Sequence, residues 1–81
     1  MSVTVCFYSY YKELTGCART SEDVVAGSTI EALFEKLGVR FPKLAPLRKS
    51  TLFAVGVDYQ DGLYVLREGD EVSLFPPVQG G

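Results

Sequence analysis

Residues 28–38, STIEALFEKLG, restrict the fold of this chain more than any other segment. Their apolar members recur at the i, i+3, i+4 and i+7 spacing of one helix face, and they are Ile30, Leu33, Phe34 and Leu37. Ser28 and Glu31 match the S-x-x-E capping box, which predicts where the helix begins, and Gly38 predicts where it ends. A chain of 81 residues has room for one core, so the apolar stripe of this helix has to be buried against the other elements of the same domain. With no second helix of this kind in the sequence, we expect that partner to be a sheet.

Strand-like segments supply that sheet. Apolar patterns predict strands at residues 2–11, 20–26, 51–57, 63–66 and 71–75. In the first of these, Val3, Val5 and Phe7 share one face of the strand. One amphipathic helix with these strands predicts a two-layer α+β fold, formed by residues 1–81 as a single domain.

Glycines and prolines predict the breaks between these elements. Residues 12–16, 58–62 and 67–70 have the composition of turns. Residues 39–50 contain two prolines, which predict a loop with one helical turn.

Composition narrows the classes of function. The net charge is −2 and the basic residues are scattered, so neither nucleic acid nor an anionic membrane is expected as a partner. No apolar run reaches the length of a membrane span and the first residues do not resemble a signal peptide, so we expect a cytoplasmic protein. With two cysteines and no histidine, the sequence does not predict a metal site, and in a cytosolic chain a Cys6–Cys17 disulfide is disfavoured.

For a few side chains the sequence does not decide between a structural and a binding role. The carboxylates Glu68, Asp70 and Glu71 surround a glycine turn and are expected to be solvated rather than metal-bound. Tyr8 and Tyr10 share a face of the predicted strand and are either ordinary strand aromatics or part of an apolar interaction surface. Phe75 belongs either to the core or to a docking surface.

The last seven residues, FPPVQGG, form an unusual tail. Pro76 and Pro77 favour an extended backbone that leaves the sheet, and six residues from there reach roughly 20 Å. Gly80 and Gly81 have no Cβ, so such a flexible tip fits a channel too narrow for side chains. The carboxylate of Gly81 is then accessible to adenylation by ATP. The alternative reading is a terminus that only frays.

Residues 66–81, LREGDEVSLFPPVQGG, closely resemble the C-terminal signature of the small subunit of molybdopterin synthase, and residues 7–16, FYSYYKELTG, resemble the first motif of that family. Two positions depart from the family pattern. Lys12 stands where arginine is frequent, and Gly56 stands where many members have asparagine.

This resemblance implies a ubiquitin-like β-grasp fold and the role of a sulfur carrier that is not itself an enzyme and binds no cofactor. An E1-like enzyme is expected to use ATP to adenylate Gly81, and a sulfurtransferase to supply the sulfur of a thiocarboxylate. The large catalytic subunit would receive the tail, including Gln79 and Gly80, and pass the sulfur to a pyranopterin precursor. Phe75, Pro76, Pro77 and Val78 would contact these partners, in a heterotetramer of two small and two large chains.

Three other functions remain open from the sequence. A sulfur carrier of the thiamine pathway also ends in two glycines, although the FPPV segment favours the molybdopterin pathway. A ubiquitin-like protein modifier would be activated at the same carboxylate. A β-grasp binding module with an inert tail would keep all its functions after deletion of Gly81.

Overall fold

The computed structural model describes residues 1–77; the tail residues Val78, Gln79, Gly80 and Gly81 lie outside the described part. In chain order the elements are strand β1 (Ser2–Phe7), helix α1 (Tyr11–Thr15), strand β2 (Arg19–Asp23), helix α2 (Ile30–Arg40), 3₁₀ helix η1 (Ala45–Ser50), and strands β3 (Leu52–Val55), β4 (Asp58–Gln60) and β5 (Glu71–Phe75). The predicted α+β class is therefore confirmed.

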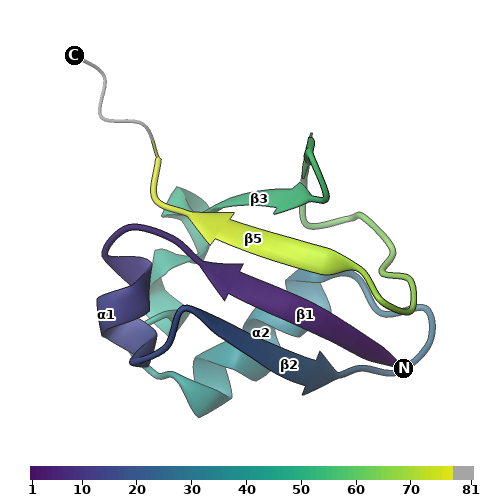
Figure 1. The fold of residues 1–81 in the computed structure, drawn as a ribbon, viewed down its shortest axis with the longest axis horizontal. Helices are drawn as coiled ribbons and strands as arrows, with labels where there is room; N and C mark the ends of the chain where they lie inside the picture. The colour runs from purple at the N-terminus through teal and green to yellow at the C-terminus, as the bar shows by residue number, and fades with distance from the viewer. Residues whose placement is uncertain (78–81) are drawn as a thin grey trace.

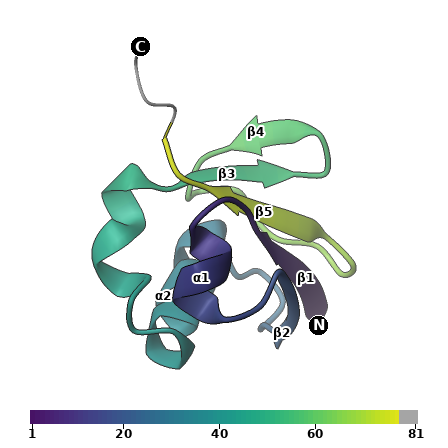
Figure 2. The same ribbon diagram turned by 60° about the vertical axis from the view of Figure 1, so that its left-hand side comes forward.

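The five strands form one mixed sheet in the order β2-β1-β5-β3-β4. β1 runs parallel to β5, and every other pair of neighbours is antiparallel. Helix α2 lies behind this sheet in Figure 1, and Figure 2 shows α1, α2 and η1 on the same side of it. One face of the sheet is thus covered by helices, and the other face is open.

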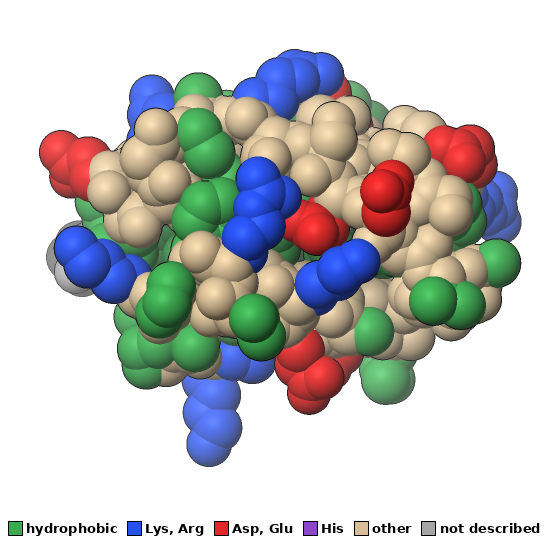
Figure 3. All heavy atoms as spheres, turned by 90° about the horizontal axis from the view of Figure 1, so that it is seen from below, with side chains coloured by type: hydrophobic (Ala, Val, Ile, Leu, Met, Phe, Trp, Pro, Cys, Tyr) green, Lys and Arg blue, Asp and Glu red, His purple; other side chains and the backbone are tan. Residues whose placement is uncertain are grey.

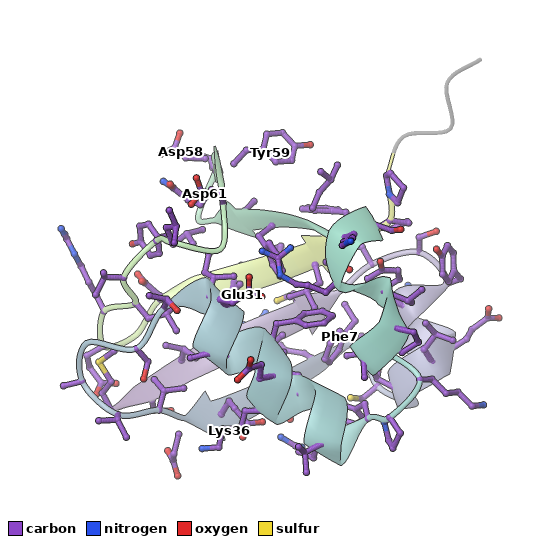
Figure 4. The ribbon with its side chains drawn as sticks, turned by 180° about the vertical axis from the view of Figure 1, so that it is seen from behind. Phe7, Glu31, Lys36, Asp58, Tyr59 and Asp61 are labelled. Carbon is purple, nitrogen blue, oxygen red and sulfur yellow. The ribbon has the colours of Figure 1, made fainter. Side chains whose placement is uncertain are left out.

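The core lies between the covered face and α2. Val3, Val5 and Phe7 of β1 are at most 1% exposed, which confirms the predicted buried face. The four predicted apolar residues of α2 are also buried, and the ring of Phe34 packs edge-on against Phe53 with centroids 5.8 Å apart. Figure 4 shows Phe7 between the sheet and the helices.

Helix α2 is shifted from its predicted limits. Its N-cap is Thr29, whose side chain accepts a hydrogen bond from Ala32 N at 3.2 Å, and not Ser28. Glu31 does not complete a capping box because its carboxylate binds Arg48. Gly38 lies inside the helix, where a Cβ would come within 3.3 Å of the Ala45 Cβ, so this glycine allows η1 to approach.

Three further predictions were wrong. Residues 58–60, expected in a turn, form β4, because Gly56 with φ 61° makes the chain reverse just before them. Residues 63–66, expected as a strand, contribute only an isolated bridge between Val65 and Thr29. The strand predicted at residues 2–11 ends at Phe7, and the chain then forms the short helix α1 from Tyr11, where the end of that strand and a turn were expected.

The outer edge of β2 is held by cations from α2. Arg40 donates to Ser21 O at 3.2 Å and pairs with Glu22 at 2.6 Å. Lys36 binds the backbone oxygen of Asp23 and lies 3.9 Å from Glu22. Figure 3 shows this underside of the molecule, where basic and acidic side chains lie next to one another.

Candidate functional site

The candidate site begins at the end of β5, where the tail leaves the sheet. Leu74 is fully buried on the covered face, whereas its neighbour Phe75 is half-buried on the open face. Phe75 pairs with Leu52 of β3, the last pair of that ladder. Beyond it the described chain runs away from the sheet, with Pro76 half-buried and Pro77 exposed (Figure 1). The prediction that sheet pairing ends at the prolines is confirmed.

Three aromatic side chains meet on the open face at this point. The ring of Tyr8 stacks on Phe75 with centroids 4.9 Å apart and planes 15° apart, and the ring of Tyr59 lies 6.2 Å from Phe75. Tyr8 is 43% exposed and Tyr59 71% exposed. We call Tyr8, Tyr59 and Phe75 the open-face aromatic cluster. Exposed aromatic rings grouped in this way are typical of protein interaction surfaces.

The connection after β1 places Tyr8 in the cluster. Its backbone N donates to Leu74 O at 3.2 Å, and the next residue, Ser9, has the left-handed φ of 56°. Left-handed backbone costs a non-glycine residue free energy and is often found at functional sites. The chain then enters α1, where the buried Tyr11 hydroxyl and Thr51 Oγ1 lie 2.8 Å apart. Since Thr51 gives its proton to Leu47 O, Tyr11 is the donor.

Small residues lie beside the cluster on the open face. Cys6, Ser73 and Ala54 are adjacent across β1, β5 and β3, and each is at most 7% exposed. Burial, followed by the charge of Glu71, raises the pKa of the Cys6 thiol above its ordinary value, while Arg19 opposes this shift. The thiol is therefore protonated near neutral pH and is no nucleophile.

The sequence placed the site only in part. Phe75 and Tyr8, both left open as interaction residues, are in contact. Tyr10, expected on the same face as Tyr8, packs instead on the ring of Tyr11 because the strand ends before it. Tyr59 was missed because residues 58–62 were expected in a turn. A β-strand reading of residues 58–60 would have placed its side chain on the open face, opposite Ala54. The predicted site residues Val78, Gln79, Gly80 and Gly81 lie outside the described residues.

Each carboxylate near the turn at Gly69 has a partner within the protein. Glu68 accepts from Ser2 N at 3.2 Å, Asp70 accepts from the Tyr64 hydroxyl at 3.1 Å, and Glu71 pairs with Arg19 at 3.0 Å. Among residues 1–77 there is no group of three or more metal-ligating side chains.

The described residues also contain no helix that is long and apolar enough to cross a membrane.

The sequence was compared with known proteins. The model of the ThiS family matches residues 5–81. A molybdopterin synthase sulfur carrier subunit from Homo sapiens is 36% identical over 98% of this chain and 93% of its own length. The protein of the same description from Arabidopsis thaliana is 26% identical over 100% of this chain and 84% of its own length.

Solved structures share the fold. SAMP1 from Haloferax volcanii superposes with a TM-score of 0.88 at 21% identity and complete coverage of both chains. A complex of subunits 1 and 2 of molybdopterin-converting factor from Helicobacter pylori contains a chain that superposes with a TM-score of 0.70 at 23% identity, also with complete coverage of both. The predicted ubiquitin-like β-grasp fold is confirmed by these likenesses.

Proposed function

The chain belongs to the ThiS family, and we propose that it is the sulfur carrier subunit of a molybdopterin synthase. The observation that carries this proposal is the open-face aromatic cluster at the base of the FPPVQGG segment. The proposed docking surface is therefore next to the start of the tail that would enter the partner. The relatives described as molybdopterin synthase sulfur carrier subunits support the choice of this pathway.

The chemistry is assigned to the carboxylate of Gly81, taken as the C-terminal residue. This carboxylate attacks the α-phosphorus of ATP, which the adenylating enzyme binds, and pyrophosphate leaves. The outer sulfur of a sulfurtransferase persulfide, reduced to the level of sulfide by a thiol reductant, then displaces AMP from the acyl-adenylate and leaves a thiocarboxylate. In the large subunit the thiocarboxylate sulfur attacks the pyranopterin precursor, and water then cleaves the resulting thioester, which leaves the sulfur on the precursor and restores the carboxylate of Gly81.

The side chains of this protein have a supporting role in these steps. The thiol of Cys6 is buried and protonated, and no metal-ligand group occurs among residues 1–77, so the described part offers docking and positioning. Phe75, half-buried against Tyr8, fixes where the tail starts, and Pro76 and Pro77 keep it extended. The bound partners supply the catalytic groups, and we place this assembly in the cytoplasm.

The large catalytic subunit is the proposed main partner, in a heterotetramer of two small and two large chains. Aromatic residues are enriched among those that dominate binding energy in protein interfaces. The cluster, together with Pro76 and Pro77, is the surface we assign to this partner and, at another stage, to the adenylating enzyme. Because both partners would use the same surface, they bind one after the other and not at the same time.

Reconstitution tests this function. The purified chain is incubated with ATP, the adenylating enzyme, a sulfurtransferase and a sulfur donor, and is then added to the large subunit with the pyranopterin precursor. We expect product from the full chain and none from a chain that lacks Gly81 or carries one extra residue after it. The melting temperatures of the two variants should equal that of the parent. Product formation by the chain without Gly81 would contradict the proposal.

A further inference from the structure

A cleft of about 690 Å³ lies next to the open-face aromatic cluster. It is lined by Leu52 and Phe53 of β3, by residues 59–62, and by Arg48 and Thr51 at the end of η1, with the guanidinium of Arg48 against Gly62. Apolar side chains with a few polar groups among them are typical of a site that receives a side chain or a small ligand.

The guanidinium of Arg48 is held in place in this cleft from three directions. Its Nε donates to the carboxylate of Glu31. Its central carbon lies 5.0 Å from the ring centre of Phe53, in a cation–π contact. Gly62 leaves the space that the guanidinium occupies, because a Cβ there would overlap Nη2. An arginine fixed in this way loses little conformational entropy when it binds a partner.

The remaining donors of Arg48 are available for binding. Within residues 1–77, neither Nη1 nor Nη2 donates a hydrogen bond, although Nε does. A guanidinium presents its N–H groups in a planar fork that matches the two oxygens of a carboxylate. Arg48 can therefore bind Glu31 through Nε and a second carboxylate through its terminal nitrogens.

The cleft is continuous with the proposed docking surface. Tyr59 lines the cleft and belongs to the cluster, and Leu52 lines the cleft and pairs with Phe75. A protein that covers the cluster and the base of the tail therefore contacts two residues of the cleft. A side chain of that protein that enters the cleft displaces water from Arg48, which strengthens an ion pair formed there.

We propose that Arg48 binds an aspartate or glutamate side chain of the subunit that receives the tail, so that the cleft determines partner specificity. This inference rests on the proposed function, since it takes the large subunit as the occupant. Asp61, whose Oδ1 accepts from Leu63 N at 2.8 Å, also lines the cleft. Figure 4 shows Asp61 near Asp58 at the β4 hairpin, away from Glu31 on α2. The partner must therefore place a cationic or amide group next to its acidic side chain, facing Asp61.

The test measures the dissociation constant of the full chain and its cognate large subunit at several salt concentrations. Arg48→Gln should weaken binding at least tenfold and reduce the dependence on salt. Gly62→Ala keeps the charge but displaces the guanidinium, and it should weaken binding severalfold. Arg67→Gln, which makes the same change in net charge in the turn at Gly69, should leave the dissociation constant within twofold of the parent.

A structural role for Arg48 is distinguished by Glu31→Gln, which removes the same internal ion pair but leaves the guanidinium in the cleft. Its loss of affinity should be clearly smaller than that of Arg48→Gln. Equal losses from these two variants, or an Arg48→Gln chain that binds within twofold of the parent, would overturn the proposal. Failure of the unmodified chain to bind the large subunit would instead contradict the proposed function itself.

Discussion

The two faces of the sheet are built from the same strands but differ in what they contact. On the covered face, Phe7 and Leu74 are at most 1% exposed and pack beneath the helices. On the open face, the next residues along the chain, Tyr8 and Phe75, are partly exposed and stack on each other. Successive side chains of a strand point to opposite faces, so a single step in sequence separates the core from the candidate site.

Because of this difference, mutations in this small domain can change stability and binding separately. The covered face buries large apolar side chains, which is the main source of folding free energy. The open face has small residues at Cys6, Ser73 and Ala54 and leaves its aromatic rings at the end where the tail leaves the sheet. A change on one face should therefore affect mainly one of the two properties.

The largest expected effect on stability is on the covered face. Phe7→Ala should lower the free energy of unfolding by about 3–5 kcal/mol, because it leaves a cavity beneath α2. Its ring also contacts Phe41 edge-on, with centroids 5.6 Å apart. Urea unfolding followed by circular dichroism measures the change. A loss below about 1 kcal/mol would mean that the covered face is not the core we describe.

On the open face the larger effect should be on binding. Phe75→Ala should weaken binding to the large subunit at least tenfold while lowering the free energy of unfolding by only about 1–2 kcal/mol, since its ring is half-buried and paired with Tyr8. Titration calorimetry and urea unfolding give the two numbers.

Tyr8 and Tyr10 provide a matched comparison, because each is 43% exposed. Tyr8→Ala should weaken binding more than Tyr10→Ala, since only Tyr8 stacks on Phe75. The same loss from both would mean that exposed aromatic area, and not the cluster, determines binding.

Burial raises the pKa of three groups among residues 1–77. Cys6 on the open face has a pKa above its ordinary 9.0, and Tyr11 of α1 and Tyr64 have values above their ordinary 10.0, with Asp70 adding to the shift of Tyr64. All three groups lose their protons more readily in the unfolded chain. Their contributions to stability are therefore complete below these ordinary values and are lost as the pH rises through the folded-state values.

Unfolding free energies measured between pH 7 and 11 test this expectation. Stability should begin to fall above pH 9, by at most about 1.4 kcal/mol per pH unit for each of Cys6 and Tyr11. Cys6→Ala should remove the part of the decline that begins first. A profile that is unchanged by Cys6→Ala would contradict the assignment.

The smallest effect distinguishes the two possible caps of α2. Thr29→Ala should cost about 1 kcal/mol of stability, because it removes the bond accepted from Ala32 N. Ser28→Ala should cost less, since no side-chain hydrogen bond of Ser28 supports the helix start; its backbone oxygen accepts from Leu66 N at 2.8 Å. Thermal unfolding of the pair measures the difference, and the reverse order would restore the capping box predicted from the sequence.

The sequence predicted those parts of the fold that depend on local pattern. The alternation of Val3, Val5 and Phe7 and the helical spacing of the α2 residues were sufficient, because each pattern reports directly on which side is buried. The limits of α2 were not predictable in this way. They depend on Arg48, which takes Glu31 away from the cap, and on Ala45, which needs the space at Gly38.

In the candidate site, too, features with a local sequence pattern were predictable and features that depend on distant contacts were not. The sequence identified Phe75 and the tail as candidates, since prolines and glycines strongly restrict or free the local backbone. The cluster was not, because Tyr8, Tyr59 and Phe75 are far apart in the chain and meet only through the parallel pairing of β1 with β5 and the hairpin of β3 with β4. The cleft at Arg48 depends on equally distant contacts.

The sulfur-carrier role is tested by the intact mass of the chain, isolated from its own cells without reducing or hydrolysing treatment. We predict a fraction of molecules whose mass has increased by the replacement of one oxygen by sulfur, with fragment masses that place the change at Gly81. A chain that carries no sulfur at Gly81 after incubation with its adenylating enzyme, sulfurtransferase and ATP, and that is found instead joined to lysines of other proteins, would contradict the sulfur-carrier role and indicate a protein modifier.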